Sequence, residues 1–387
     1  MDALDIAEQF SQHLNSPKQT WLFGAGISYN ANIPLMYPLT ELVFDRIKKN
    51  DKANNVLTSI KGECGKNSHI EHHLTYLGDL ISLANQAESK KVLFSNAEIC
   101  ESTLLGIYKL IISEITKIIR WGHKSNCAQE NQSHLQIDEH LEFVKAIFNT
   151  SRAGLDLMRS PVEFYTTNYD TLLEDALALN RIHYRDGFSG GAVAFWDPAD
   201  FGRKESVKAR LYKLHGSINW YQKSDDNSYL FRIRHEDNYP MPKSGENGNV
   251  MIYPQATKYL NTQRDPFAQL FQKFRKRLAD GVDHVLFICG YSFGDEHINA
   301  EIEQAMRSNS SQLTLIAFVK EPTDLIKIWG ETPWGERVFV VSSEGLYQGS
   351  SGPHFSDSAE SSNWWTFDGV TKLINTGLPA DIQEKMQ

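Results

Sequence analysis

Short apolar runs alternate with stretches of helical periodicity along most of the chain. Runs typical of strands occupy residues 20–23, 162–170, 210–222, 229–235, 284–289, 312–319 and 337–341. Apolar side chains recur at helical spacing over residues 3–14, 39–49, 70–84, 98–121 and 137–158. Strands that alternate with helices predict an α/β fold built on a Rossmann-like, doubly wound parallel sheet.

The helices of residues 70–158 interrupt this alternation after the first strand. They predict a helical lobe inserted into a large domain of residues 1–320, which a C-terminal extension of uncertain role follows at 321–387. The apolar stripe at 104–119 predicts a core or a contact between subunits. Residues 344–362, rich in Ser and Gly, indicate a loop or linker.

Composition narrows the class of protein. The 387 residues are 41% hydrophobic and carry a net charge of −9, so a direct nucleic-acid binder is not expected. The basic segment 271–278 fits a solvated helix face. The sequence shows no run of about 20 apolar residues and no secretory leader, which predicts a cytoplasmic protein without a membrane span. The cysteines form no CxxC pair, so neither a zinc ribbon nor a disulfide framework is expected: Cys64, Cys100, Cys127 and Cys289.

Polar or small residues follow three of the predicted strands directly. They are Gly24 to Ser28, Thr167 to Asp170, and Gly290 to Asp295. In an open parallel sheet, ligands bind outside the carboxyl ends of the strands. If the three strands are neighbours, the three segments therefore meet at one crevice.

The first segment suits a pyrophosphate, because glycines admit close backbone approach and a following helix would offer its N-terminus. It is not a complete GxGxxG motif, since Tyr29 takes the last glycine position, and a tight turn without a ligand is an open alternative. Asp45 lies at the spacing of a ribose-binding acid but fits a solvated helix face better.

Each polar candidate also has a structural interpretation. Asp170 and Asp295 can cap the helices that follow them. Asn168 precedes the cap position and is harder to explain in this way, while His215 lies between two apolar strand segments and can be a structural histidine. The histidines at 69, 72 and 73 fit a helix surface better than a metal site.

Taken in order, the motifs Gly-Ala-Gly-Ile-Ser, Thr-Thr-Asn-Tyr-Asp, Leu-His-Gly-Ser-Ile-Asn and Gly-Tyr-Ser-Phe-Gly-Asp resemble the sirtuin family over about residues 20–320. The divergent bacterial sirtuin-like branch is the most similar. The resemblance implies an NAD site, with His215 as the catalytic histidine and Asn168 and Asp170 near the nicotinamide ribose. The implied NAD-binding residues are Gly24, Ala25, Gly26, Ser28, Thr167, Gly290, Ser292 and Asp295.

The departures from the family pattern point to a particular reaction. Deacetylating sirtuins carry two CxxC pairs and a Gly-Ile-Pro-Asp-Phe-Arg segment, where this chain has no pair and reads Asn32-Ile33-Pro34-Leu35-Met36-Tyr37. The resemblance therefore implies an NAD hydrolase without a metal. It also implies a homo-oligomer that works with a HerA-like hexameric ATPase and depletes NAD in antiphage defence.

Three other functions stay open. The chain can be an NAD-dependent deacylase or ADP-ribosyltransferase, which would transfer its group to an acceptor other than water. It can be a catalytically silent NAD sensor or scaffold, which would bind NAD without releasing nicotinamide. A small-alarmone or nucleotide-binding Rossmann protein is a further option if His215 lies far from the glycine loop.

Overall fold

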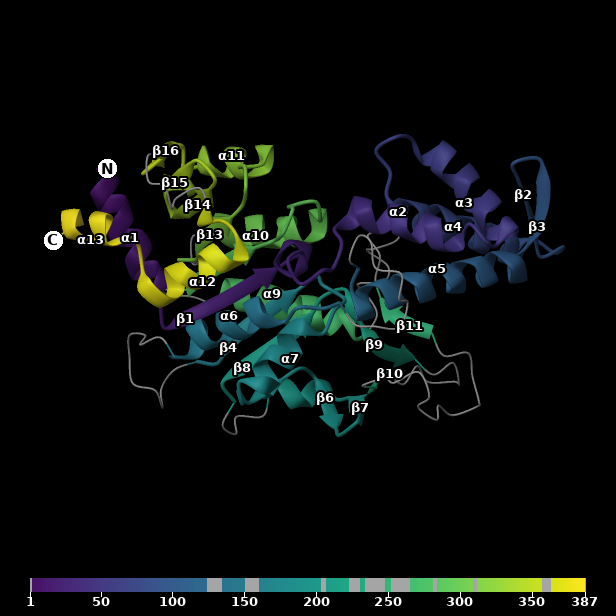
Figure 1. The fold of residues 1–387 in the computed structure, drawn as a ribbon, viewed down its shortest axis with the longest axis horizontal. Coiled ribbons are helices and arrows are strands. Elements are labelled where there is room, and N and C mark those ends of the chain that lie inside the picture. Colours follow the sequence, from purple (N-terminus) through teal and green to yellow (C-terminus); the bar gives the residue numbers. More distant parts are fainter. Residues whose placement is uncertain are drawn as a thin grey trace.

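The computed structural model describes residues 2–123, 134–149, 160–202, 207–222, 230–233, 248–251, 265–280, 284–308, 312–356 and 363–386. Cys127 and residues 150–158 of the expected helix lie outside these ranges. Figure 1 shows the arrangement of the helices and strands, coloured along the sequence.

Within the described residues, nine strands form the main sheet in the order β16-β15-β14-β13-β12-β1-β4-β8-β5. Their bounds are β1 Lys18–Phe23, β4 Val162–Thr166, β5 Tyr184–Arg185, β8 Ala209–Lys213, β12 His284–Cys289, β13 Thr314–Phe318, β14 Val338–Ser342, β15 Gly345–Gln348 and β16 Ser351–His354. The strands from β14 to β5 pair in parallel, while β15 and β16 are antiparallel. The predicted α/β, doubly wound parallel sheet is confirmed.

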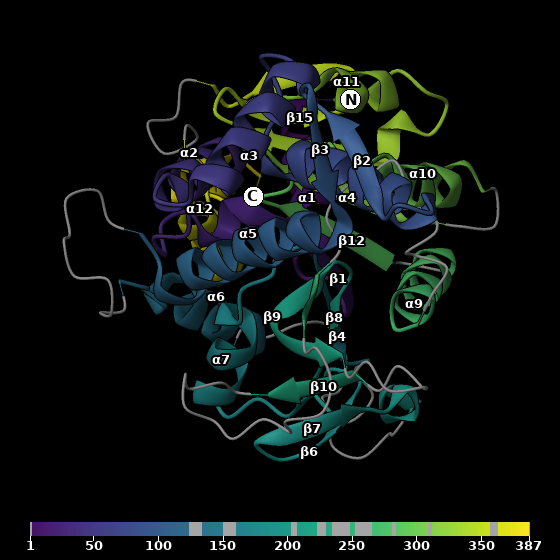
Figure 2. The same ribbon diagram turned by 90° about the vertical axis from the view of Figure 1, so that its right-hand side faces the viewer.

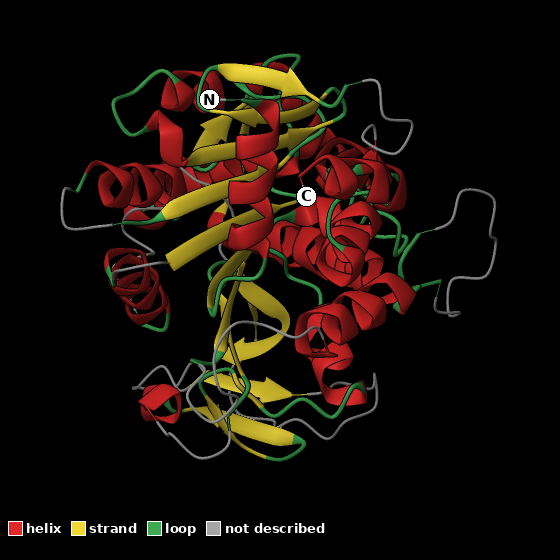
Figure 3. Ribbon diagram, turned by 90° about the vertical axis from the view of Figure 1, so that its left-hand side faces the viewer, coloured by secondary structure: helices red, strands yellow, loops and turns green. Residues whose placement is uncertain are grey.

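Helices cover both faces of this sheet (Figure 3). One face packs against α1 (Ala3–Leu14), α6 (Asp138–Asn149), α7 (Leu172–Leu179), α12 (Phe367–Thr376) and α13 (Ala380–Met386). The other packs against α9 (Phe267–Ala279), α10 (Glu296–Arg307) and α11 (Asp324–Gly330). Successive residues of a strand point to opposite faces, so Trp21 and Phe23 enter the first core and Leu22 the second. Burial on both faces explains why the β1 sequence is continuously apolar.

The C-terminal residues are part of the main domain's core. β14 continues the parallel sheet, and α12 places Phe367 against Phe143 of α6, with ring centroids 4.9 Å apart. The segment 344–362, expected as a loop, instead contains β15 and β16. β15 pairs antiparallel with β14 and β16 with β15, which provides backbone partners that the Ser- and Gly-rich composition did not reveal.

The helical lobe has its own hydrophobic core and projects beyond the end of the sheet in Figure 1; Figure 2 shows it from its outer side. It comprises α2 (Met36–Ile47), α3 (Asp51–Cys64), α4 (Ile70–Gln86), the hairpin of β2 (Lys91–Phe94) and β3 (Ala97–Cys100), and α5 (Glu101–Trp121). By packing, the lobe thus spans about residues 36–121, where the sequence suggested 70–158. α6 packs on the sheet, with Phe143 edge-on to Trp21 at 5.1 Å.

The apolar stripe of α5 faces the interior of the lobe. Ile111 and Ile118 are fully buried there, beside residues of α2 and α4 such as Val43 and Leu77. These side chains form the lobe's core, so they are not available as a contact between subunits. Among the described residues, no helix is both long and apolar enough to cross a membrane.

A second, antiparallel sheet lies beside the main one. In the part of the chain that is described, its five strands follow the order β11-β9-β10-β7-β6. They are β6 Phe188–Gly190, β7 Val193–Trp196, β9 Gly216–Gln222, β10 Leu230–Ile233 and β11 Gly248–Met251. Three short 3-10 helices, η1 (Ala25–Ser28), η3 (Pro198–Gly202) and η4 (Gly335–Arg337), complete the described elements.

Candidate functional site

Four strands of the main sheet end at the same level. Phe23, the last residue of β1, pairs with Cys289 at the end of β12 and with Thr166 at the end of β4. Thr166 in turn pairs with Lys213 at the end of β8. The loops that follow these strands, which carry the predicted site residues, therefore share one edge of the sheet.

The glycine loop packs directly on the loop after β12. The backbone N–H groups of Gly24 and Gly26 donate to the carbonyl oxygens of Cys289 (3.1 Å) and Gly290 (2.8 Å). A Cβ on Gly24 would lie 2.5 Å from the carbonyl oxygen of Gly290. A Cβ on Gly26 would lie 2.6 Å from the Cα of Gly290. Gly290 itself has φ of +67°. These glycines are therefore required, first of all, for two backbones to touch.

A short turn, and not the N-terminus of an α-helix, follows the glycine loop. Ala25 begins the 3-10 helix η1, and the next α-helix starts only at Met36. Ala25 and Gly26 are exposed at the edge, while Ser28 is buried. The backbone at 25–26 is thus open to a ligand, but the expected helix dipole is not directly behind it.

Ser28, Asn168 and Asp170 form one buried hydrogen-bond network. The hydroxyl of Ser28 donates to Oδ2 of Asp170 (2.9 Å) and accepts from Nδ2 of Asn168 (3.1 Å). Oδ1 of Asp170 accepts from the backbone N–H of Leu172 (3.1 Å), so Asp170 also holds the start of α7. Oδ1 of Asn168 is buried and has no hydrogen-bond partner among the described residues. This amide oxygen can accept a hydrogen bond from a hydroxyl group of a ligand.

Thr167 closes the β4 loop onto β1. Its backbone N–H donates to the carbonyl oxygen of Phe23 at 3.0 Å. The hydroxyl of the preceding Thr166 accepts from the N–H of Asn168, also at 3.0 Å. The backbone around Asn168 is thereby fixed on both sides.

His215 reaches across the edge to Asp295. Its Nε2 lies 3.0 Å from Oδ2 of Asp295, and both side chains are buried. Oδ1 of the same carboxylate caps α10 by accepting from the N–H groups of His297 (3.0 Å) and Ile298 (3.4 Å). His215 therefore contacts the loop whose Gly290 packs on the glycine loop. Ser292 lies in that loop as well and is exposed.

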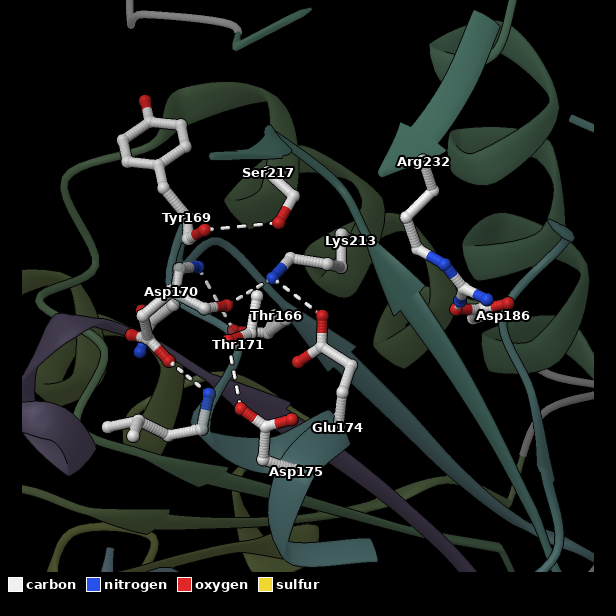
Figure 4. Close-up of polar contacts among 12 residues, drawn as sticks. Thr166, Tyr169, Asp170, Thr171, Glu174, Asp175, Asp186, Lys213, Ser217 and Arg232 are labelled. Atoms are coloured by element: carbon white, nitrogen blue, oxygen red, sulfur yellow. Dashed lines mark hydrogen bonds and ion pairs between the residues drawn. The ribbon is translucent and has the colours of Figure 1, made fainter. Parts of the chain in front are cut away.

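A buried lysine beneath these residues was not predicted. Lys213 is 3% exposed, and its ammonium donates to the backbone oxygen of Asp170 and to Oε1 of Glu174 (2.9 Å), as Figure 4 shows. Burial raises the pKa of Glu174, and Lys213 opposes this shift. The available signal was a lysine at the end of an apolar strand, two residues before His215.

Tyr169 joins the site to neighbouring elements. Its backbone oxygen accepts from the hydroxyl of Ser217 (3.1 Å) and the N–H of Ile218 (3.0 Å). Its own hydroxyl lies 3.5 Å from Oε1 of Glu71, a buried residue of α4. The loop between β4 and α7 thus contacts both the second sheet and the helical lobe.

A pocket of about 450 Å³ adjoins Asp170. α5, α7 and the second sheet line it, so all three parts of the molecule contribute. Polar lining residues include Arg120, Asp170, Asp175, Asn219 and Arg232. Arg232 forms an ion pair with Asp186. A volume of this size is typical of sites for small organic molecules.

The described residues contain no cluster of three or more His, Cys, Asp or Glu side chains arranged to bind a metal ion. The interpretation of His69, His72 and His73 as helix surface is wrong for His73. This ring is fully buried, and its Nε2 lies 2.9 Å from Oγ of Ser68. Burial lowers its pKa to about 4.

Comparison with known proteins relates part of the chain to one domain family. No curated protein matches the chain. A Sir2 homologue in complex with NAD aligns with 98% of this chain and 94% of its own, at 10% identity and a TM-score of 0.41. A mutant Sir2 homologue in complex with ADP-ribose aligns with 100% of this chain and 98% of its own, at 11% identity and a TM-score of 0.43. Residues 162–345, which contain Asn168, His215 and Asp295 but not the glycine loop, match the family model of the SIR2-like domain.

Proposed function

We propose that this protein hydrolyses NAD at the bond between nicotinamide and ribose, releasing nicotinamide and ADP-ribose. One observation carries the proposal: the glycine loop, the Ser28–Asn168–Asp170 network and the His215–Asp295 pair share one edge of the sheet. The match of residues 162–345 to the SIR2-like domain supports it.

The residues present fit this substrate in two respects. At Ala25 and Gly26 no side chain extends beyond a Cβ and the backbone is exposed, so a diphosphate can approach it closely. Oδ1 of Asn168 lacks a hydrogen-bond partner among the described groups and can accept a hydrogen bond from a ribose hydroxyl. Ser28 and Asp170 hold that amide in place.

The chemistry asks for charge stabilisation and proton handling. Nicotinamide leaves as a neutral base, so the ribose carbon gains positive charge as the bond breaks. Asn168 would orient the ribose or the attacking water. His215 would take a proton from the water or a ribose hydroxyl, and Asp295 would stabilise the protonated ring. Positioned acid–base catalysis of this kind contributes about 10²–10⁴-fold to a rate.

The biological setting is part of the proposal. The sequence resemblance supports a homo-oligomer that acts with a HerA-like ATPase and depletes NAD in antiphage defence. A freely active NAD hydrolase is toxic, so basal turnover is expected to be low and to rise when the partner engages. Co-purification with such an ATPase, followed by NAD turnover of the complex and of the chain alone, tests this part.

The pocket beside Asp170 favours a second candidate, ADP-ribosyl transfer to an acceptor other than water. It can hold a small acceptor beside Asp170, the residue whose carboxylate Ser28 contacts. Transfer would yield an ADP-ribosylated product, whereas hydrolysis yields free ADP-ribose. Deacylation is less favoured, because the sequence lacks the two CxxC pairs of deacetylating sirtuins.

Product analysis separates these functions. The purified chain is incubated with NAD at micromolar enzyme concentration, and the products are identified by chromatography. Hydrolysis predicts nicotinamide and free ADP-ribose in equal amounts. Nicotinamide without free ADP-ribose indicates transfer or cyclisation, and NAD binding without nicotinamide release indicates a sensor.

A further inference from the structure

The carboxyl end of β8 carries a buried charge that the proposed reaction does not itself use. Lys213 is 3% exposed, and Glu174, its partner on α7, is 8% exposed. In Figure 4 the ammonium of Lys213 points between Glu174 and the backbone of Asp170 and donates to both. Lys213 therefore connects β8 to the loop that carries Asn168 and to the helix that follows it.

The contact with Asp170 has a specific mechanical consequence. On the side of β8 and β9, the backbone of this loop also accepts from the N–H of Leu214, which donates to Thr166 (2.9 Å), and from Ser217 and Ile218, which donate to Tyr169. Lys213 adds the hydrogen bond to the next carbonyl, at Asp170. The end of β8 is thus joined to the loop after β4 one residue beyond Tyr169, at the residue whose carboxylate contacts Ser28.

Stability alone does not account for a buried ion pair. Two charges in a protein interior lose their hydration, and a well-packed apolar pair of similar size is often at least as stable. What an apolar pair cannot supply is a donor to the carbonyl oxygen of Asp170. We propose that Lys213 is a positioning residue, which fixes Asn168 and Asp170 relative to His215; this inference rests on the proposed NAD hydrolysis.

Two variants separate positioning from stability. In Lys213→Met/Glu174→Leu, an apolar pair replaces the ion pair and the donor to Asp170 is lost. In Glu174→Gln, the ion pair is lost, but the amine of Lys213, charged or neutral, still donates to Asp170. The measurements are Tm, kcat and KM for NAD, and hydrogen exchange of the backbone amides at 167–171.

The expected results run in opposite directions. The double variant keeps a Tm within about 3 °C of the wild type, because the apolar pair offsets the lost ion pair. Its kcat falls about 10- to 100-fold, since a misplacement of about 1 Å at a reacting group can cost 10²-fold. KM changes less than about threefold, as the glycine loop is untouched, and amides 167–171 exchange faster. Glu174→Gln lowers Tm yet keeps kcat within about threefold of the wild type.

A double variant that retains wild-type kcat and wild-type exchange at 167–171 overturns the inference. So does a Glu174→Gln variant whose kcat falls about 10-fold or more below that of the wild type, and this test against the wild type still applies if the double variant fails to fold. If the wild type releases no nicotinamide, NAD hydrolysis itself fails. Hydrogen exchange then tests the positioning role of Lys213 by itself. Faster exchange of amides 167–171 in the double variant supports this role, and unchanged exchange refutes it.

Discussion

Nε2 of His215 lies 3.0 Å from Oδ2 of Asp295, although the two residues are 80 positions apart in the sequence. The strands that precede them, β8 and β12, are separated in the sheet by β4 and β1. The pair therefore spans the ends of four neighbouring strands. Asp295 combines two tasks, because its second carboxylate oxygen caps α10.

The dual task of Asp295 predicts a separation of activity from stability. Asparagine is also a good N-cap, so Asp295→Asn should change the free energy of unfolding by less than about 1 kcal/mol. It should lower nicotinamide release by about tenfold or more, because a neutral amide stabilises the protonated imidazole poorly. Enzyme assays and urea unfolding measure the two effects.

Thr323→Ala provides the matched control for this prediction. Thr323 caps a different helix, α11, by accepting from the N–H of Ile326. Its loss should cost about 1 kcal/mol of stability and leave the rate unchanged. An Asp295→Asn variant with full activity would remove Asp295 from the account of catalysis.

Ser28→Ala is expected to impair both the fold and the site. The substitution deletes the donor to Asp170 and the acceptor for Asn168, both of which are buried. Leaving such groups unsatisfied costs about 1–3 kcal/mol, and the freed amide of Asn168 should lower kcat. Ser82→Ala, on the exposed face of α4, should change stability by less than about 0.5 kcal/mol. Equal behaviour of the two variants would show that the buried network is unimportant.

The contact between the glycine loop and Gly290 predicts a strong effect of one methyl group. In Gly26→Ala the new Cβ would lie 2.6 Å from Cα of Gly290, so two loop backbones must separate. NAD affinity, measured by calorimetry, should fall about tenfold or more, equivalent to ~1.4 kcal/mol. Gly62→Ala in α3 meets nothing within 4 Å and should raise stability by about 0.5–1 kcal/mol. Unchanged NAD affinity in Gly26→Ala would place the dinucleotide elsewhere.

His284 predicts part of the acid sensitivity of the fold. Burial, with the nearby cations Arg277 and Lys18, lowers its pKa to about 3 in the folded chain, against about 6.5 for a solvated histidine. Below pH 6.5 the unfolded chain therefore binds a proton at this histidine that the folded chain does not bind. The free energy of unfolding falls as the pH decreases below 6.5. Between pH 6.5 and 4.5 this group should cost about 2–3 kcal/mol of unfolding free energy.

Urea unfolding of the wild type and His284→Gln at pH 7 and pH 4.5 checks this contribution. The variant lacks the titrating ring that faces Thr20, so its loss of stability on acidification should be smaller by the stated amount. Identical losses in both proteins would mean that His284 is protonated in the folded state at pH 4.5.

The sequence predicted the strand ends of the site well, because polar residues that directly follow apolar runs mark where buried strands stop. It could not predict that His215 contacts Asp295. The local sequence around Asp295 predicts a helix cap, and the structure has one there. No local pattern can predict a partner 80 residues away. Lys213 was missed for a related reason: a lysine in a strand normally indicates an exposed position, and only the arrival of Glu174 from α7 permits its burial.

Tertiary packing also decided what periodicity could not. The amphipathic pattern of α6 predicts a helix but does not tell which core contains Phe143. In the structure Phe143 packs in the core of the main sheet, not in that of the lobe. The strands β6 and β7 have three and four residues. Among the described residues they pair with each other, and β7 pairs in addition with the distant β10. Segments this short carry too little alternation to be recognised without their partners.

Nicotinamide release from NAD by the wild type, His215→Ala and Asn168→Ala, measured side by side by chromatography, tests the central claim most directly. The account predicts release by the wild type and a loss of about 10²-fold or more in each variant, with Tm values that show folded protein. Folded variants that release nicotinamide at the wild-type rate, or a wild type that releases none, would contradict it.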